Sequence, residues 1–188
     1  MYSFKFKESE HVIREYLRKH PNSKAAERAL NGDCAAMMEL YEKLCGLEEF
    51  DGGATDEAVF IIYEAYNRKY PPAMIRLAQV EMCDGIQYWP EGVMILMEAY
   101  KLGSQEAMTQ LKNDWHNCVR DIEDKRKVGD RINKYEEFLL AFYYYHGIEV
   151  AKDETLALCL FKSSAKLGCE EAKRMLQHIL TIRGGCHR

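Results

Sequence analysis

The chain has 188 residues, enough for one domain with a continuous core and too few for two ordinary domains without a visible linker. Hydrophobic residues make up 47% and charged residues 30% of the chain, which excludes an intrinsically disordered protein. The formal net charge of -4 argues against a broad nucleic-acid-binding surface, because phosphate binding requires a clustered excess of Lys and Arg.

Long tracts without proline predict an all-helical chain, since the prolines are confined to Pro21, Pro71, Pro72 and Pro90. In chain order, we expect helices over residues 8–19, 23–31, 34–46, 55–69, 72–84, 90–102, 104–118, 120–133, 134–146, 153–167 and 169–182. No segment requires a strand. No apolar run reaches the 18 residues that a membrane-spanning helix needs, so no membrane association is expected.

The chain contains internal repeats. The segment 61–77 (IIYEAYNRKYPPAMIRL) matches ILMEAYKLGSQEAMTQL, which lies 34 residues later. A further copy is LFKSSAKLGCEEAKRML at 160–176, and NGDCAAMMEL at 31–40 supplies an earlier one. Self-similarity with a period in this range is typical of solenoids built from stacked helix pairs.

Each copy contains an alanine followed four residues later by a leucine. These repeat alanines are Ala36, Ala73, Ala107 and Ala172, and a degenerate start at Glu136 divides the long interval before the last one. We therefore expect one repeat domain, with N-terminal capping helices at 1–35, units at 36–72, 73–106, 107–135 and 136–171, and a C-terminal capping helix and tail at 172–188.

Residues four apart lie on one helical face, where the alanine permits close approach and the leucine fills the adjacent groove. Gly32, Gly103 and Gly168 each lie four residues before a repeat alanine. Glycine adopts the left-handed conformation most easily, so these positions are predicted to end the preceding helix. Each unit is thus a helix, a loop and a second helix.

The run LAFYYYHGIEVAKDETLALCLFKSSAKLGCEEA at 140–172 resembles a Sel-one-like repeat, a subfamily of the tetratricopeptide-type solenoids. Tyr144 stands at the family's core tyrosine and Gly147 at its loop glycine, whereas Glu149 replaces a second loop glycine. The resemblance implies a right-handed α-solenoid, that is, an α/α superhelix of stacked helix-loop-helix repeats. It also implies an adaptor or scaffold role, with protein or peptide binding and no catalysis.

Residues three and seven positions after each unit start fall off the Ala/Leu stripe and are predicted to line an inner binding surface. They are Glu39, Lys43, Arg76, Val80, Gln110, Asp114, Leu139 and Tyr143. In the aromatic run at 142–145, giving Tyr144 to the core leaves Tyr143 or Tyr145 presented to a partner, although packing between repeats is an equal alternative. Trp89 is expected at an exposed loop edge, and Trp115 in the core.

No catalytic, cofactor or metal motif is present. The six histidines lack metal-site spacing, and the acidic stretch 48–57 is better explained by helix capping and solubility than by metal binding. The seven cysteines show no paired spacing, which favours reduced thiols in the cytoplasm over a disulfide framework.

We therefore expect a non-enzymatic adaptor that binds a protein or peptide, with no cofactor. Two alternatives stay open: a small-molecule-binding or hydrolytic protein of the cysteine-rich branch of the family, and a partner-neutralising protein with an immunity or host-targeting role.

Overall fold

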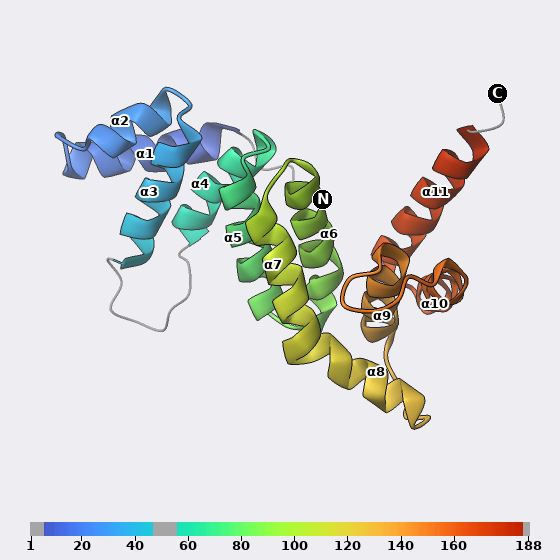
Figure 1. Cartoon of the computed structure of the whole chain (residues 1–188). Helices are drawn as coiled ribbons and strands as arrows, with labels where there is room; N and C mark the ends of the chain where they lie inside the picture. Colours follow the sequence, from blue (N-terminus) through green and yellow to red (C-terminus); the bar gives the residue numbers. More distant parts are fainter. Residues whose placement is uncertain (1–5, 47–55, 186–188) are drawn as a thin grey trace. The chain divides into compact units, whose positions relative to one another are not determined.

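The computed structural model describes residues 6–46 and 56–185 (Figure 1). Its helices are α1 (Phe6–Lys19), α2 (Lys24–Leu30), α3 (Cys34–Gly46), α4 (Asp56–Asn67), α5 (Pro71–Cys83), α6 (Trp89–Lys101), α7 (Gln105–Asp114), α8 (Arg120–Lys127), α9 (Lys134–His146), α10 (Glu154–Lys166) and α11 (Glu170–Gly185). A 3-10 turn, η1 (Ile86–Tyr88), precedes α6, and a π-helical segment, η2 (Trp115–Val119), joins α7 to α8. The described ranges contain no strand, which confirms the all-α prediction.

The helices group into two compact units. Unit 1 comprises the described residues of Met1–Val80 and Glu98–Ser104, and unit 2 those of Glu81–Met97 and Gln105–Arg188. Within each unit, consecutive helices pack on one another, as in the pairs α2 with α3, α3 with α4, α9 with α10 and α10 with α11. The expected helix-loop-helix organisation is therefore present in both units.

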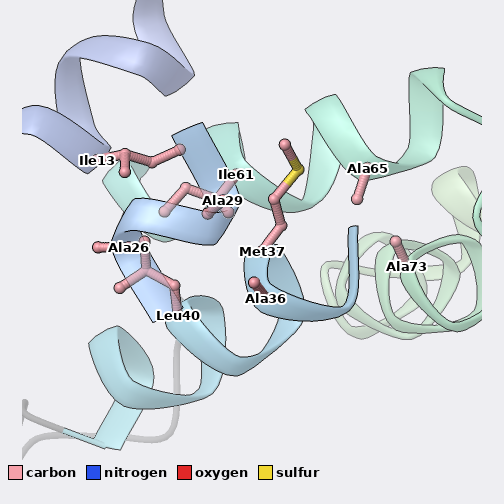
Figure 2. Close-up of a cluster of buried hydrophobic side chains, with 9 residues drawn as sticks. All are labelled: Ile13, Ala26, Ala29, Ala36, Met37, Leu40, Ile61, Ala65 and Ala73. Carbon is pink, nitrogen blue, oxygen red and sulfur yellow. The ribbon is translucent and has the colours of Figure 1, made fainter. Parts of the chain in front are cut away.

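The core of unit 1 is built largely from small side chains (Figure 2). Helices α1 to α5 contribute Ile13, Ala26, Ala29, Ala36, Met37, Leu40, Ile61, Ala65 and Ala73 to one cluster. Because many of these residues are alanines, neighbouring backbones can approach closely while Met37, Leu40 and Ile61 fill the space between them.

The repeat alanines are all fully buried, with Ala36, Ala73, Ala107 and Ala172 at 0% exposure. Leu40 and Leu111 are also at 0% and Leu77 at 1%, which confirms the Ala/Leu face predicted from the sequence. The last copy differs, because Leu176 is only half-buried and Met175 occupies the buried position instead.

The three glycines predicted to end helices have left-handed backbones, with φ of 89° at Gly32, 99° at Gly103 and 89° at Gly168. Two of their carbonyl groups accept hydrogen bonds from cations one repeat away. Arg68 Nη1 donates to the Gly32 carbonyl at 3.1 Å, and Lys134 Nζ to the Gly168 carbonyl at 3.0 Å. These bonds satisfy loop carbonyls that lie just beyond the end of a helix.

The loop between α9 and α10 follows the repeat pattern in its backbone. Gly147 is left-handed at φ 68°, and Glu149, at the position of the family's second loop glycine, is also left-handed at φ 57°. Asp153 begins α10 by accepting a hydrogen bond from the Leu156 N–H at 2.9 Å. The backbone at position 149 thus keeps the left-handed conformation that glycine favours, although the residue here is glutamate.

Helix α9 contains the longest unbroken run of buried residues in the described part of unit 2. Its residues 138–143 are all buried, because α10, α8, η1 and η2 contact it from different directions. Asn133 and Glu136 form a capping box at its start. The segment before it departs from the prediction: residues 105–127 form one continuous helical path through η2, and α8 ends at Lys127.

A matched pair of alanines tests the close helix contact. Ala36 is fully buried, whereas its neighbour Ala35 on the same helix is exposed. We expect Ala36→Leu to lower the free energy of unfolding by about 1–3 kcal/mol through overpacking, and Ala35→Leu to change it by less than about 0.5 kcal/mol. Chemical denaturation of both variants measures the difference; equal stabilities would show that the assigned register is wrong.

Candidate functional site

In unit 1, the first two predicted binding residues form an exposed charged cluster on α3. Lys43 Nζ lies 2.8 Å from Glu39 Oε1, and the Arg28 guanidinium lies 3.2 Å from the other oxygen of the same carboxylate. The hydrogen bond from Lys43 lowers the pKa of Glu39. Both side chains keep close to half of their surface exposed, so they are accessible to a partner.

Arg76 on α5 lies against a buried tyrosine of α3. Its Cζ is 5.4 Å from the centroid of the Tyr41 ring, and Nη1 donates a weak hydrogen bond of 3.4 Å to Gln79. Its Nε is buried without a hydrogen-bond partner, and Arg76 makes no ion pair within the described ranges. Burial, with a further contribution from a hydrogen bond to Cys45, raises the pKa of Tyr41 to about 12, so the ring is neutral. Val80, the other predicted residue of α5, is half-buried.

In unit 2, the structure brings Gln110 and Asp114 together at the end of α7. Gln110 Nε2 donates to Asp114 Oδ1 at 2.8 Å. Asp114 is only 6% exposed, and its Oδ2 is buried without a hydrogen-bond partner. Burial raises the pKa of the Asp114 carboxyl to about 6, a shift that the Gln110 bond partly opposes.

The prediction that Leu139 and Tyr143 lie on an exposed surface is wrong, since both are 0% exposed. Their helix, α9, is contacted on several sides, so positions off the Ala/Leu stripe are also covered. The Tyr143 hydroxyl donates to the Leu111 carbonyl at 2.8 Å, and burial raises its pKa well above the usual value. Tyr143 therefore packs between repeats, the alternative that the sequence left open.

The neighbouring tyrosine also departs from the prediction. Tyr144, expected in the core, is half-buried, and its hydroxyl donates to the Glu123 carboxylate, which is 6% exposed. This bond links α9 to α8, and Lys127 pairs with the same carboxylate at 3.3 Å. Trp115 is 4% exposed, as predicted for the core, and its ring centroid lies 5.4 Å from that of Tyr143.

The two remaining aromatic candidates are half-buried. Tyr145 packs edge-to-face on Phe161, with ring centroids 6.3 Å apart, and Lys152 lies over its ring. Trp89 opens α6 instead of standing on a loop edge, and its indole N–H donates to the Met82 carbonyl at 3.0 Å. Part of each ring is held inside the protein, so neither is a freely presented side chain.

Two residues that contact or lie near the predicted binding positions were not among those predicted from the repeat pattern. Tyr41 supports Arg76 from the preceding repeat, and Cys118 follows Asp114 by one helical turn. The charge on Asp114 contributes to the raised pKa of both Cys118 and Tyr143, which places the carboxylate close to them. The four-residue spacing could indicate that Cys118 lies on the same helical face as Asp114. It could not indicate which helix packs over Asp114.

Within residues 6–46 and 56–185, no three His, Cys, Asp or Glu side chains converge in a way that could hold a metal ion. The six cysteines described are unpaired. None of the helices in these ranges has the length and apolar character to cross a membrane. Most of the acidic stretch 48–57 lies outside the described residues.

The fold and the repeat pattern together define an all-α helical-repeat protein. Neither the models of known protein families nor the curated proteins contain a match to the chain. Among solved structures, the chain is similar to a protective antigen present in uropathogenic Escherichia coli strains that displays an SLR fold, with 18% sequence identity and a TM-score of 0.42. The match covers 86% of this chain and 36% of the antigen, so this chain spans about a third of that protein. At this TM-score the likeness carries no argument about the site.

The Tyr143 hydroxyl is expected to stabilise unit 2. Tyr143→Phe removes the donor to the Leu111 carbonyl and should lower the free energy of unfolding by about 1 kcal/mol. Tyr88, which is 41% exposed, provides the control, and Tyr88→Phe should leave stability unchanged. Thermal melts of the two variants compare the effects; an unaffected Tyr143→Phe protein would mean that the buried hydroxyl bond contributes nothing.

The raised pKa of Asp114 leads us to expect an unusual pH dependence of the free energy of unfolding. Because its pKa is raised from 3.8 to about 6 on folding, the folded protein binds the proton more tightly, and stability falls as pH rises through this interval. Asn carries no charge, so Asp114→Asn should raise the free energy of unfolding near pH 7 by up to about 3 kcal/mol, with the gain shrinking toward pH 4. Urea denaturation at several pH values measures this. A loss of stability at neutral pH would mean that the carboxylate has a stabilising partner.

Proposed function

We propose that the chain is a non-enzymatic cytoplasmic adaptor that binds a protein or peptide partner through the surface of its repeat helices. The observation that carries this proposal is Arg76, whose half-buried guanidinium rests on the Tyr41 ring and has no acidic partner within the described ranges. Unpaired cysteine thiols are compatible with a reducing compartment.

Arg76 differs from the other arginines and lysines around it. Arg28 pairs with Asp33 and Glu39, Arg68 with Glu64, and Lys69 with Glu98. Arg76 instead has one N–H buried without an acceptor, which is unfavourable unless a further group supplies that acceptor. The planar guanidinium, held in place by the aromatic ring, is well suited to pair with a carboxylate of a bound protein.

The surroundings of Arg76 support binding more than catalysis. The neighbouring helix α3 presents Glu39 and Lys43 at the equivalent repeat positions, with both charges exposed. Arginine and tyrosine are the residue types most often found at the energetic centre of protein interfaces. The alternative of a disulfide-stabilised small-molecule-binding protein gains no support from the unpaired cysteines. A partner-neutralising role is a special case of the same binding function.

The test is affinity capture with the wild-type protein, Arg76→Gln and Lys24→Gln. Lys24 is exposed on α2, so its change removes the same charge elsewhere in unit 1. A partner identified by mass spectrometry should bind the Arg76→Gln protein about thirtyfold more weakly, as expected for an interface arginine worth about 2 kcal/mol. Lys24→Gln should bind normally. If all three proteins bind equally and have the same melting temperature, Arg76 does not contribute to the interface. If the wild type captures no protein, the adaptor function is contradicted.

A further inference from the structure

The α-helical hydrogen-bond pattern is interrupted between α7 and α8. Residues Trp115–Val119 form a π-helical turn, in which the Arg120 N–H donates to the carbonyl of Trp115, five residues earlier. Asp114 is the last residue of α7, directly before this turn. Short π-helical insertions are uncommon and are frequently found at functional sites.

The Asp114 carboxylate has fewer hydrogen bonds than its burial requires. An ionised carboxylate offers about four acceptor positions, and here Gln110 supplies a donor to Oδ1 only. Oδ2 is buried without a partner, although the residue is more than nine-tenths buried. A buried acceptor of this kind lowers stability unless a donor reaches it, and the most favourable donor is a positive charge.

Among the described residues of unit 2, no cation is placed to provide that charge. The nearest basic side chains in sequence, Lys112 and His116, pair with Glu149, at 3.6 Å and 3.0 Å respectively. The titratable groups that the Asp114 charge acts on are Cys118 of η2 and Tyr143 of α9, and both are acids. The Tyr143 hydroxyl donates to Leu111 and so cannot also donate its proton to Asp114.

The helix surface that continues from Asp114 carries charges of both signs, since Arg120 and Asp121 are both exposed. Asp121, two helical turns further along, is exposed, and its charge acts together with that of Asp114 to raise the pKa of Cys118, after the larger effect of burial. Gln110 holds the Asp114 carboxylate in a fixed orientation. Unit 2 thus contains one fixed, largely desolvated acceptor at Asp114, whose pKa is affected by burial and by Gln110 but by no neighbouring cation.

We propose that Asp114 is the binding position for a basic side chain, arginine or lysine, of the partner protein. This inference rests on the proposed adaptor function and specifies the chemistry of the partner in unit 2. A guanidinium is the better fit, because it is weakly hydrated and can donate two hydrogen bonds to a carboxylate at once. Because Oδ2 is buried in the unbound protein, the bound cation would first have to displace the groups that cover it, and it would then supply the missing donor and neutralise the charge.

The experiment is selection of peptides from a displayed random library on three proteins: wild type, Asp114→Asn and Asp130→Asn. Asp130 is exposed in the loop after α8, so its variant controls for the loss of one negative charge. We expect the wild type and Asp130→Asn to enrich peptides that share an arginine or lysine at one position, and Asp114→Asn to lose that preference. Circular dichroism verifies that Asp114→Asn is folded.

The selected peptide is then measured by fluorescence anisotropy beside a version in which citrulline replaces the arginine, or norleucine the lysine. Binding to the wild type should weaken at least about tenfold with the neutral residue, and binding to Asp114→Asn should be insensitive to the exchange. Peptides that lack a shared basic residue, or that bind Asp114→Asn as tightly as wild type, would overturn the inference while leaving the adaptor function intact. If the wild type selects no peptide and captures no protein, the adaptor function itself is contradicted.

Discussion

The structure depends on the close approach of helices at the repeat alanines. A side chain larger than a methyl group at these positions would force the helix axes apart, because the interaxial distance is set by the residues at the contact. Ala36, Ala65 and Ala73 belong to one cluster, so three successive helices of unit 1 contribute alanines to the same core. In unit 2, Ala107 and Ala172 are equally buried. A left-handed residue lies four positions before each repeat alanine, and it is Gly32, Gly103 or Gly168 except before Ala73, where it is Lys69.

The helices and their contact face could be predicted because they depend on local spacing. An alanine and a leucine four residues apart, with a glycine four residues before them, specify a helix, its start and its buried face without reference to the rest of the chain. Leu139 and Tyr143 could not be placed in this way, since they are covered by segments distant in sequence, including η1 and η2. Likewise, the spacing of residues 105–127 does not indicate a π-helical turn, and the prediction divides this stretch into two separate helices.

Polar groups without partners occur at two of the predicted repeat positions, one in each unit. Arg76 has an N–H without an acceptor and Asp114 an oxygen without a donor, and both are held by a glutamine three or four residues away in the same helix. Most buried polar groups in proteins are satisfied, so such exceptions require an explanation. The two proposed interactions offer one for each, since an acidic group of a partner would complete the first and a basic group the second. The sequence indicated these two positions only by their distance from the start of each repeat unit. Their burial and orientation are set by the packing of the helices and could be seen only in the structure.

The π-helical turn between α7 and α8 has an evolutionary consequence. Loss of one residue from Trp115–Val119 would restore an ordinary α-helix and rotate everything after it by about 100° about the helix axis. That rotation would carry Glu123 away from the Tyr144 hydroxyl and turn the buried Ile122 toward water. Because no single amino-acid replacement compensates for such a rotation, a deletion here is not a neutral step between related sequences. Among descendants of this chain, the length of this segment should therefore be far more constant than the identity of its residues.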